Sequence, residues 1–364
     1  MLKKISNIIT VGLIGIFVFS FMIWSIIKEP SQYSLSERRK LAQFPDIQIE
    51  KIKTGETMKE LSEYMIDQFP LRDGFLSLNS TFFFDVLQKK DVNGLYVSEQ
   101  DAIAMEYPYN PESLRYASSI FSKISKQYLN HSNRVYLSII PDKSYFLEDQ
   151  AYLKLDYQQF VREMKQQNQQ MQYIDIMNAL CLDDYYDTDP HWRQERIVDV
   201  AKQLAEGMGV EVEQDYDVIE MESQFYGSYY HRLPYRLKPE TLYFLTNETI
   251  QNCIVYDHQN QKQIAMYDLE KINDKDAYEL YLSGPLSYIT IENPKMSSGK
   301  ELIIFRDSFG SSIAPLLASG YHKITLIDIR YLPSSTLDRY IQFEGKDILF
   351  LYSTSVLNHS KTLK

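Results

Sequence analysis

The sequence predicts an α/β domain with a mostly parallel sheet and a β-rich insertion, preceded by one transmembrane helix. Three observations lead to this prediction. Residues 8–27 carry no charge, helical periodicity alternates with short apolar runs in much of the remaining chain, and residues 210–294 contain short strand-like runs between polar turns. The chain has 364 residues, of which 44% are hydrophobic and 13% aromatic, so it can bury a core and is not disordered as a whole.

Residues 8–27 are long enough to cross a bilayer as one helix. These twenty residues, at about 1.5 Å each, match a hydrocarbon core of roughly 30 Å. Lys3 and Lys4 precede the run, which predicts a cytoplasmic N-terminus and an extracytoplasmic remainder. The alternative is a cleaved secretion signal, but its apolar region is usually only about 7–15 residues long and ends in small residues, whereas residues 21–24 are Phe, Met, Ile and Trp. We expect an uncleaved signal-anchor and a single-pass protein of the cell membrane.

The predicted domain organisation follows from this anchor. Residues 1–28 form the cytoplasmic stub and the anchor, residues 29–50 a polar stalk, and residues 51–364 the extracytoplasmic domain. Helical periodicity in residues 57–69 and 75–88 predicts an N-terminal helical section of that domain.

The α/β pattern starts at residue 111, where Asn110 and Pro111 are a favourable helix start. Helices are expected at residues 111–129, 157–170, 197–208, 311–320 and 335–343, and strands at residues 135–140, 173–177, 301–305, 324–329 and 347–352. Strands that alternate with helices favour a parallel sheet covered on both faces. The β-rich insertion, at about residues 210–295, is expected to consist of short antiparallel strands.

Charge and cysteine content exclude several classes of protein. Without Lys3 and Lys4, 36 basic residues stand against 49 acidic ones, a charge of −13, which argues against a nucleic-acid partner. Cys181 and Cys253 are too few for a disulfide framework or a four-thiolate zinc site, and the sequence leaves open whether they pair. No cofactor and no metal are predicted, because the acidic residues near His191 lack the spacing of a calcium-binding loop.

The first candidate site follows the predicted strand at residues 301–305. Ligand sites in parallel sheets gather at the carboxyl ends of strands, and Asp307-Ser308-Phe309-Gly310 stands at such an end, just before a helix. A serine at this turn can present its hydroxyl as a nucleophile, and the backbone N–H groups there can stabilise an oxyanion. Simple capping of the helix by Asp307 or Ser308 is the alternative.

The second candidate site is Asp189-Pro190-His191-Trp192, expected at the start of the helix at residues 197–208. Helix capping by Asp189 before Pro190 is again the ordinary explanation. The Asp189 carboxylate can, however, accept the Nδ1 proton of His191 and leave Nε2 free as a base. A nearby serine would complete a catalytic triad.

Other strand ends contribute candidates for substrate contact. These are Lys143 after the strand at 135–140, and Arg330 and Tyr331 after the strand at 324–329; Trp192 beside the histidine is a further candidate. For Lys143, a solvated turn at Pro141-Asp142 is the alternative.

Together, the Asp189-Pro190-His191-Trp192 and Asp307-Ser308-Phe309 motifs resemble the D-x-H-W and D-S-F motifs of the DHHW proteins and of the related alginate O-acetyltransferase (AlgJ/AlgX-like) proteins. Residues 34–45, 67–73 and 281–293 resemble further family segments, so the resemblance spans nearly all of the predicted ectodomain. It implies an SGNH hydrolase-like three-layer fold.

The resemblance also implies roles for individual residues. Ser308 would be the nucleophile, His191 the base and Asp189 the orienting acid. The oxyanion would be stabilised by the Ser308 N–H with a second donor from a loop, for which Gly284 and Asn293 are the candidates.

The implied activity is O-acetyl transfer to a cell-surface or secreted polysaccharide through an acetyl-serine. The resemblance further implies a membrane-bound O-acyltransferase as the acetyl-donating partner. A carbohydrate acetylesterase with the same triad, and a non-catalytic membrane-tethered glycan-binding or scaffold protein, remain open alternatives.

Overall fold

The computed structural model consists of two compact units. One comprises residues 1–92 and 230–236, the other residues 93–229 and 237–364. The described residues are 2–34, 39–148, 152–230, 232–233, 237–274, 276–296 and 299–364. Residues 35–38, which belong to the predicted stalk and to one segment of the family resemblance, lie outside them. The predicted boundaries at residues 28 and 50 fall within the first unit and remain predictions.

The first unit begins with the long apolar helix α1, Leu2–Ile27. Its residues Ile5–Ile27 are long and apolar enough to cross a membrane, and this is the one such helix in the described part of the chain. A secretion signal would pass the same test. The helix itself is therefore confirmed, and its role as an uncleaved anchor stays a prediction.

The first unit continues with short helices and strands. Their bounds are β1 Tyr33–Ser34, β2 Arg39–Lys40, α2 Ile49–Thr54, α3 Glu56–Asp67, α4 Arg72–Thr81 and β3 Asp91–Val92, with a π-helical turn Phe82–Val86 after α4. The two helices predicted over residues 57–69 and 75–88 correspond to α3 and to α4 with its π-helical turn.

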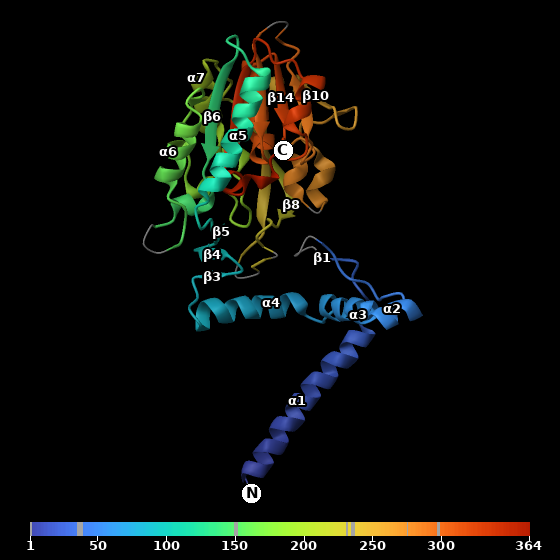
Figure 1. Cartoon of the computed structure of the whole chain (residues 1–364). Helices are drawn as coiled ribbons and strands as arrows, with labels where there is room; N and C mark the ends of the chain where they lie inside the picture. Colours follow the sequence, from blue (N-terminus) through green and yellow to red (C-terminus); the bar gives the residue numbers. More distant parts are fainter. Residues whose placement is uncertain are drawn as a thin grey trace. The chain divides into compact units, whose positions relative to one another are not determined.

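The second unit is built on an eight-stranded sheet with the order β11-β10-β12-β14-β13-β15-β6-β7 (Figure 1). From β14 to β7 all neighbours are parallel, whereas β12, β10 and β11 run antiparallel to their neighbours. The mostly parallel sheet is therefore confirmed. The strand bounds are β6 Arg134–Ile140, β7 Gln172–Tyr173, β10 Ile254–Asp257, β11 Lys262–Ile264, β12 Tyr288–Glu292, β13 Glu301–Arg306, β14 Lys323–Ile327 and β15 Asp347–Ser353.

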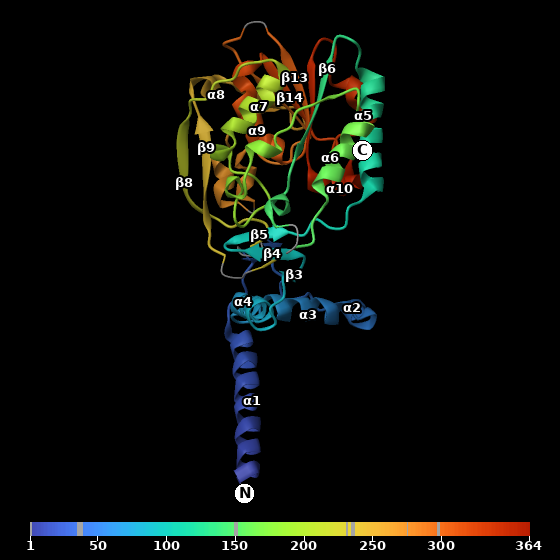
Figure 2. The ribbon, with the colours of Figure 1, turned by 90° about the vertical axis from the view of Figure 1, so that its left-hand side faces the viewer.

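Helices cover both faces of this sheet and make three layers, as Figure 2 shows. One face carries α5 Pro111–Tyr128, α6 Tyr157–Gln167 and α10 Thr354–Asn358; the other carries α7 Val198–Met208, α8 Glu248–Asn252 and α9 Phe309–Leu317. Side chains of β13 alternate between the two cores, because successive residues of a strand point to opposite faces. Leu302 and Ile304 pack with α7 and α9, and Ile303 and Phe305 pack with α5 and α6.

Helix α5 shows how the sequence specifies this layer. The Asn110 side chain accepts a hydrogen bond from the Ser113 N–H at 3.1 Å, and Pro111 occupies the first helical position, as predicted. Leu114, Ala117, Phe121 and Ile124 recur at helical spacing and are fully buried against the sheet.

The β-rich region between residues 210 and 295 is divided between two sheets. Strands β8 Asp217–Phe225 and β9 Glu240–Thr246 form an antiparallel ribbon of their own. Strands β10, β11 and β12 instead extend the main sheet, since β12 pairs with β14. The antiparallel pairing was predicted from the turn pattern, but sequence periodicity did not reveal which sheet each strand joins.

Three other segments differ from the prediction. Of the strand expected at residues 173–177, only Tyr173 lies in β7. The helix expected at 335–343 is a shorter 3-10 helix, Ser334–Arg339. A hairpin of β4 Leu95–Ser98 and β5 Asp101–Ala104 was not predicted. All three elements are short, so they give little periodic signal.

Candidate active site

Ser308 stands between the end of β13 and the start of α9. The Asp307 carboxylate accepts hydrogen bonds from the Phe309 N–H at 3.1 Å and from the Ser353 N–H at 2.8 Å, so Asp307 fastens the turn to the end of β15. The predicted capping thus falls to Asp307. Ser308 is half-buried, and its hydroxyl is not used to cap the helix.

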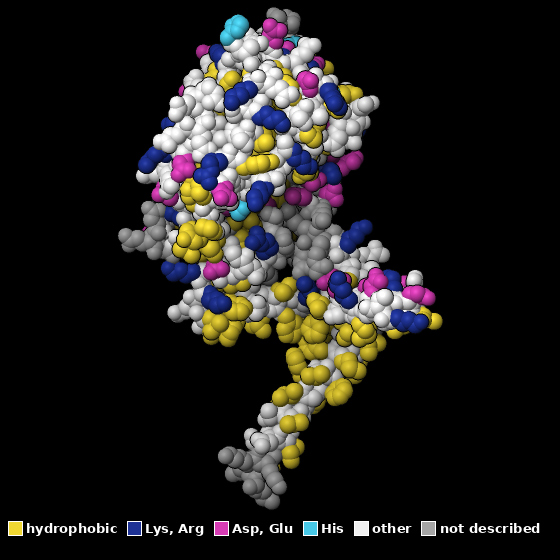
Figure 3. All heavy atoms as spheres, viewed as in Figure 1, with side chains coloured by type: hydrophobic (Ala, Val, Ile, Leu, Met, Phe, Trp, Pro, Cys, Tyr) yellow, Lys and Arg dark blue, Asp and Glu magenta, His cyan; other side chains and the backbone are white. Residues whose placement is uncertain are grey.

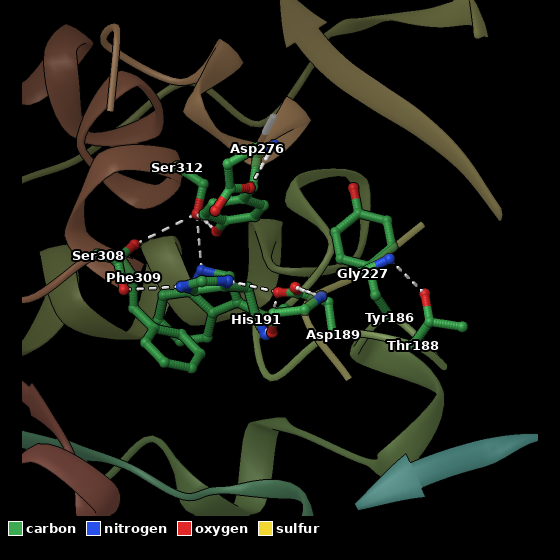
Figure 4. Close-up of polar contacts among 12 residues, drawn as sticks. Tyr186, Thr188, Asp189, His191, Gly227, Asp276, Ser308, Phe309 and Ser312 are labelled. Carbon is green, nitrogen blue, oxygen red and sulfur yellow. Dashed lines mark hydrogen bonds and ion pairs between the residues drawn. The ribbon is translucent and has the colours of Figure 1, made fainter. Parts of the chain in front are cut away.

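The hydroxyl of Ser308 meets His191, which lies 117 residues earlier in the chain (Figure 4). The distance from His191 Nε2 to Ser308 Oγ is 2.7 Å, and that from His191 Nδ1 to Asp189 Oδ1 is 2.5 Å. The fold thus brings the three residues predicted as a triad into one hydrogen-bonded chain.

The hydrogen bonds between Ser308, His191 and Asp189 define which nitrogen of the histidine carries the proton. An ionised carboxylate only accepts hydrogen bonds, so the contact with Asp189 requires the proton on His191 Nδ1. In the neutral ring, Nε2 is then an acceptor, and the Ser308 hydroxyl donates to it. This is the arrangement in which a histidine can remove the serine proton during nucleophilic attack.

The Asp189 carboxylate is held by backbone N–H groups. Its Oδ1 accepts from the His191 N–H at 3.1 Å and its Oδ2 from the Ser228 N–H at 2.7 Å. Gly227 allows this approach, because a Cβ at this position would lie 2.1 Å from the Thr188 carbonyl oxygen. Sequence reasoning placed Asp189 at a helix start, but α7 begins only at Val198, and the support comes from a loop 39 residues away.

Glu240, at the start of β9, fixes the turn just before Asp189. Its carboxylate accepts three hydrogen bonds, each 2.8 Å long, from the N–H groups of Asp187 and Thr188 and from the Thr188 hydroxyl. Thr188 Oγ1 accepts in turn from the Gly227 N–H at 2.9 Å. Burial raises the pKa of the Glu240 carboxyl above its ordinary value of 4.5. Nothing in the sequence marked Glu240, because its partners lie more than fifty residues away.

The raised pKa of Glu240 predicts a pH-dependent effect of Glu240→Gln. At pH values between 4.5 and the raised pKa, Glu240 keeps its proton in the folded state but has released it in the unfolded state. The contribution of Glu240 to the free energy of unfolding is therefore largest below pH 4.5 and decreases as the pH rises. The glutamine does not titrate. The free energy of unfolding of the wild type minus that of Glu240→Gln should therefore decrease with rising pH in denaturant titrations from acid to neutral pH. A difference that stays constant or grows would contradict this prediction.

The His191 ring is also held in place by Tyr278, which Ser312 links to Trp192. The His191 ring stacks on Tyr278, with centroids 4.0 Å apart, and burial raises the pKa of Tyr278 well above its ordinary value, so its hydroxyl stays protonated. Ser312 Oγ lies 2.8 Å from the Tyr278 hydroxyl and accepts from Trp192 Nε1 at 2.7 Å. Trp192 is fully buried and also meets Phe309 edge-on. Its predicted substrate contact is wrong; Trp192 joins the histidine loop to α9.

Trp192 and Tyr331 were both predicted to bind substrate, but their replacement by alanine is expected to affect the stability of the fold very differently. Trp192→Ala should lower the free energy of unfolding by about 3–5 kcal/mol, because it leaves a cavity where the buried indole packs. Tyr331→Ala, at a residue that is 53% exposed, should change it by no more than about 0.5 kcal/mol. Denaturant unfolding measures both. Equal effects of the two substitutions would refute this assignment.

Lys143 is also buried and serves the fold. Its ammonium lies 2.7 Å from Asp101 Oδ1 and donates to the carbonyl oxygens of Tyr186 and Asp187, at 2.7 and 3.0 Å. Through the ion pair and these two hydrogen bonds, Lys143 joins β5 to the loop that leads to Asp189. Both the predicted substrate contact and the alternative of a solvated turn are wrong, because this turn is covered by the β4–β5 hairpin and the loop.

Arg330 and Tyr331 do lie at the carboxyl edge of the sheet, just after β14. The Arg330 guanidinium makes a bidentate contact with Asp328, with Nε–Oδ1 and Nη2–Oδ2 distances of 2.9 and 2.6 Å. Its centre also lies 5.6 Å from the centroid of the Tyr331 ring. Both side chains remain partly or fully exposed, so their substrate contact stays a prediction.

The second oxyanion donor was predicted wrongly. Asn293 follows β12, which is antiparallel to β14, so it lies at the edge of the sheet opposite to Ser308, and its side-chain amide donates to the Ala318 carbonyl. The Gly284 N–H already donates to the Tyr281 carbonyl at 3.3 Å. Among the described residues, no acceptor is recorded for the Ser308 N–H, which leaves this donor available.

Neither a metal site nor a disulfide is found in the described part of the chain. No three His, Cys, Asp or Glu side chains there are grouped so as to hold a metal ion. Cys181 and Cys253 are both free thiols.

Fold and site together define a three-layer α/β domain with a mostly parallel sheet, in which Ser308, His191 and Asp189 are in contact at the carboxyl edge of the parallel strands. Among solved structures, a DHHW family protein from Eubacterium siraeum aligns with a TM-score of 0.58 and 20% identity over 73% of this chain and 93% of that one. PatB1 of Bacillus cereus with a sulfonyl adduct aligns with a TM-score of 0.57 and 16% identity, over 72% and 97% of the two chains. The resemblance to the DHHW proteins is thus confirmed for the fold.

A third solved structure, the O-acetyltransferase domain of Pseudomonas putida AlgJ, aligns with a TM-score of 0.45 and 12% identity, over 73% of this chain and 92% of that one. No protein-family model matches the sequence, and no curated protein matches it either.

Proposed function

We propose that this protein is an extracytoplasmic O-acetyltransferase, held at the cell membrane by α1, that acetylates a cell-surface or secreted polysaccharide. The observation that carries the proposal is the hydrogen-bonded chain from Ser308 through His191 to Asp189. The sequence motifs that resemble those of alginate O-acetyltransferases indicate the acyl group and the class of acceptor. A membrane-bound O-acyltransferase is the proposed source of the acetyl group.

In the first half-reaction, His191 Nε2 takes the Ser308 proton while Ser308 Oγ attacks the acetyl carbonyl of a donor. The Ser308 N–H stabilises the oxyanion that forms, and the donor's leaving group takes the proton from His191 as it departs. The product is an acetyl ester of Ser308.

In the second half-reaction, a sugar hydroxyl attacks the acetyl-serine. His191 removes the proton of that hydroxyl, the acetyl group passes to the sugar oxygen, and the proton returns to Ser308 Oγ. Asp189 stabilises the positive charge on His191 in both steps. Arg330 and Tyr331, which stay accessible at the same edge of the sheet, are the proposed contacts to the polysaccharide.

The proposal is tested by following one acetyl group. The full chain in detergent is incubated with p-nitrophenyl acetate, and intact-mass spectrometry is expected to show one added acetyl group on Ser308. An oligosaccharide acceptor should then remove the group and become acetylated faster than water hydrolyses it. Acetyl loss only to water, across a panel of oligosaccharides, would establish an esterase and overturn the transferase. A protein that is unlabelled and also releases no p-nitrophenolate would overturn both.

A second probe tests the nucleophile without an acetyl donor. A structure with the same fold carries a sulfonyl adduct, and sulfonyl fluorides modify activated serine hydroxyls. We expect phenylmethylsulfonyl fluoride to modify Ser308 and to block its later acetylation.

A further inference from the structure

Helices α3 and α4 and the π-helical turn after α4 leave a set of large apolar side chains partly or largely exposed. We call these residues the apolar collar face; each of them is between 38% and 66% exposed. The apolar collar face consists of Met58, Met65, Ile66, Leu71, Phe75, Leu78, Phe82 and Val86. A globular protein rarely exposes so many large apolar side chains together without a partner.

The exposed side chains follow the period of a helix. Leu71, Phe75, Leu78, Phe82 and Val86 recur at intervals of three or four residues, so they form one stripe along α4 and its π-helical turn.

Helix α3 is amphipathic in the same way. Acidic side chains lie on the other side of α3 from Met58 and Met65: Glu60 pairs at 2.8 Å with Lys51 of α2, and Glu63 lies 4.0 Å from Lys59. The polar side of α3 is thus occupied by ion pairs and its other side is apolar.

The apolar collar face is continuous with α1. Phe21, near the end of α1, stacks on Phe69 with ring centroids 5.4 Å apart and meets Phe75 at 5.6 Å. Phe69 and Phe75 are themselves 5.6 Å apart, so the three rings join α1 to α3 and α4. Figures 1 and 3 show α3 and α4 crosswise to α1, with hydrophobic side chains along α1 and on the side of α3 and α4 from which α1 leaves.

We infer that the apolar collar face lies in the interface of the lipid bilayer that α1 crosses. A helix that leaves the hydrocarbon core ends at the level of the headgroups, and amphipathic helices that lie flat there bury their apolar side by about 5–10 Å. The inference rests on the proposed anchoring by α1 and goes beyond it. It gives the chain a second membrane contact besides α1.

The charge of this region specifies the kind of contact. Residues 49–86 contain four basic and seven acidic side chains, so attraction to anionic lipid does not drive the binding. Burial of the apolar side chains does, and neutral phosphatidylcholine is therefore a sufficient partner. The alternative occupant is another membrane protein.

The test measures the depth of single nitroxide labels on the full chain in phosphatidylcholine vesicles. Labels are placed by Met65→Cys and Leu78→Cys on the apolar collar face and by Ile16→Cys in the middle of α1, in a background with Cys181→Ser and Cys253→Ser. Glu63→Cys is the matched control, because its side chain is 57% exposed on the other side of α3, close to the 60% of Met65. Relative accessibility to oxygen and to a water-soluble nickel chelate gives the depth.

We expect the Ile16 label in the hydrocarbon core, the Met65 and Leu78 labels about 5–10 Å below the surface, and the Glu63 label in water. Addition of phosphatidylserine should leave these depths unchanged. Met65 and Leu78 labels in water, with Ile16 in the core, would overturn the inference and leave the anchor intact. An Ile16 label in water would overturn the anchoring, and the inference with it. Protection of Met65 and Leu78 only in native membranes would assign the surface to a protein partner and also overturn the inference.

Discussion

Replacement of Ser308 by alanine is expected to abolish acyl capture and to lower ester turnover by on the order of 10⁶-fold. The change removes the hydroxyl that lies 2.7 Å from His191 Nε2, so no acetyl-enzyme can form at this position. Intact-mass spectrometry after incubation with p-nitrophenyl acetate measures the loss of the acetyl group, and release of p-nitrophenolate measures the rate.

Ser311→Ala is the matched control for this variant. Ser311 is a buried serine in the first turn of α9, three positions after Ser308, and it makes no side-chain hydrogen bond to other described residues. Ser311→Ala should gain one acetyl group as the wild type does. If Ser308→Ala is still acetylated at a histidine-dependent rate, the nucleophile is another residue and the proposed mechanism fails.

Asp189→Asn is expected to lower kcat by about 10⁴-fold with little change in KM. The carboxylate sets the proton on His191 Nδ1, whereas an amide can present an N–H there and favour the tautomer with the proton on Nε2. That tautomer cannot accept the Ser308 proton. Steady-state kinetics with an acetyl ester give the two constants separately.

Asp187→Asn is the control for the loss of a carboxylate in this loop. The Asp187 backbone is bound by Glu240 and Lys143, but no contact of its side chain with His191 is recorded, so this variant should retain a rate close to that of the wild type. Comparable losses in both variants would mean that the loop requires negative charge in general, and that Asp189 does not act through the tautomer of His191.

The position of Asp189 in the candidate triad depends on hydrogen bonds between segments that lie far apart in the sequence. Glu240 binds the turn at residues 187–188, Thr188 binds Gly227, and the next residue of that loop, Ser228, binds Asp189. Each member of this series reaches the next through a backbone N–H. Such contacts do not depend on the donor's side-chain type, which is why the sequence showed no motif for them.

Local features of the sequence were sufficient for much of the fold and for the three central residues of the site. The uncharged run at residues 8–27 predicted α1, helical periodicity predicted α5, and short apolar runs between helices predicted the parallel strands. Ser308 was identified because it follows a buried strand, and His191 because a carboxylate stands two residues before it.

The sheet that β12 joins, and therefore the edge at which Asn293 lies, was decided only by the tertiary structure. Asn293 follows an apolar strand just as Ser308 does, yet β12 runs antiparallel to β14 and carries Asn293 to the opposite edge of the sheet. Side-chain alternation does not depend on which strand is the neighbour, so the sequence pattern predicted antiparallel strands here but could not assign each of them to a sheet.

The sequence by itself determined the long apolar helix α1, the α/β class and the residues of the candidate triad, because uncharged runs, periodicity and the residue types at strand ends can be read locally. Only the tertiary structure decided that Trp192 and Lys143 are buried, that Glu240 and Ser228 hold the Asp189 loop, and that α3 and α4 share an apolar face with α1. The reason is physical. Periodicity records what each residue does within its own element, whereas burial and hydrogen bonding at these positions depend on partners tens of residues away.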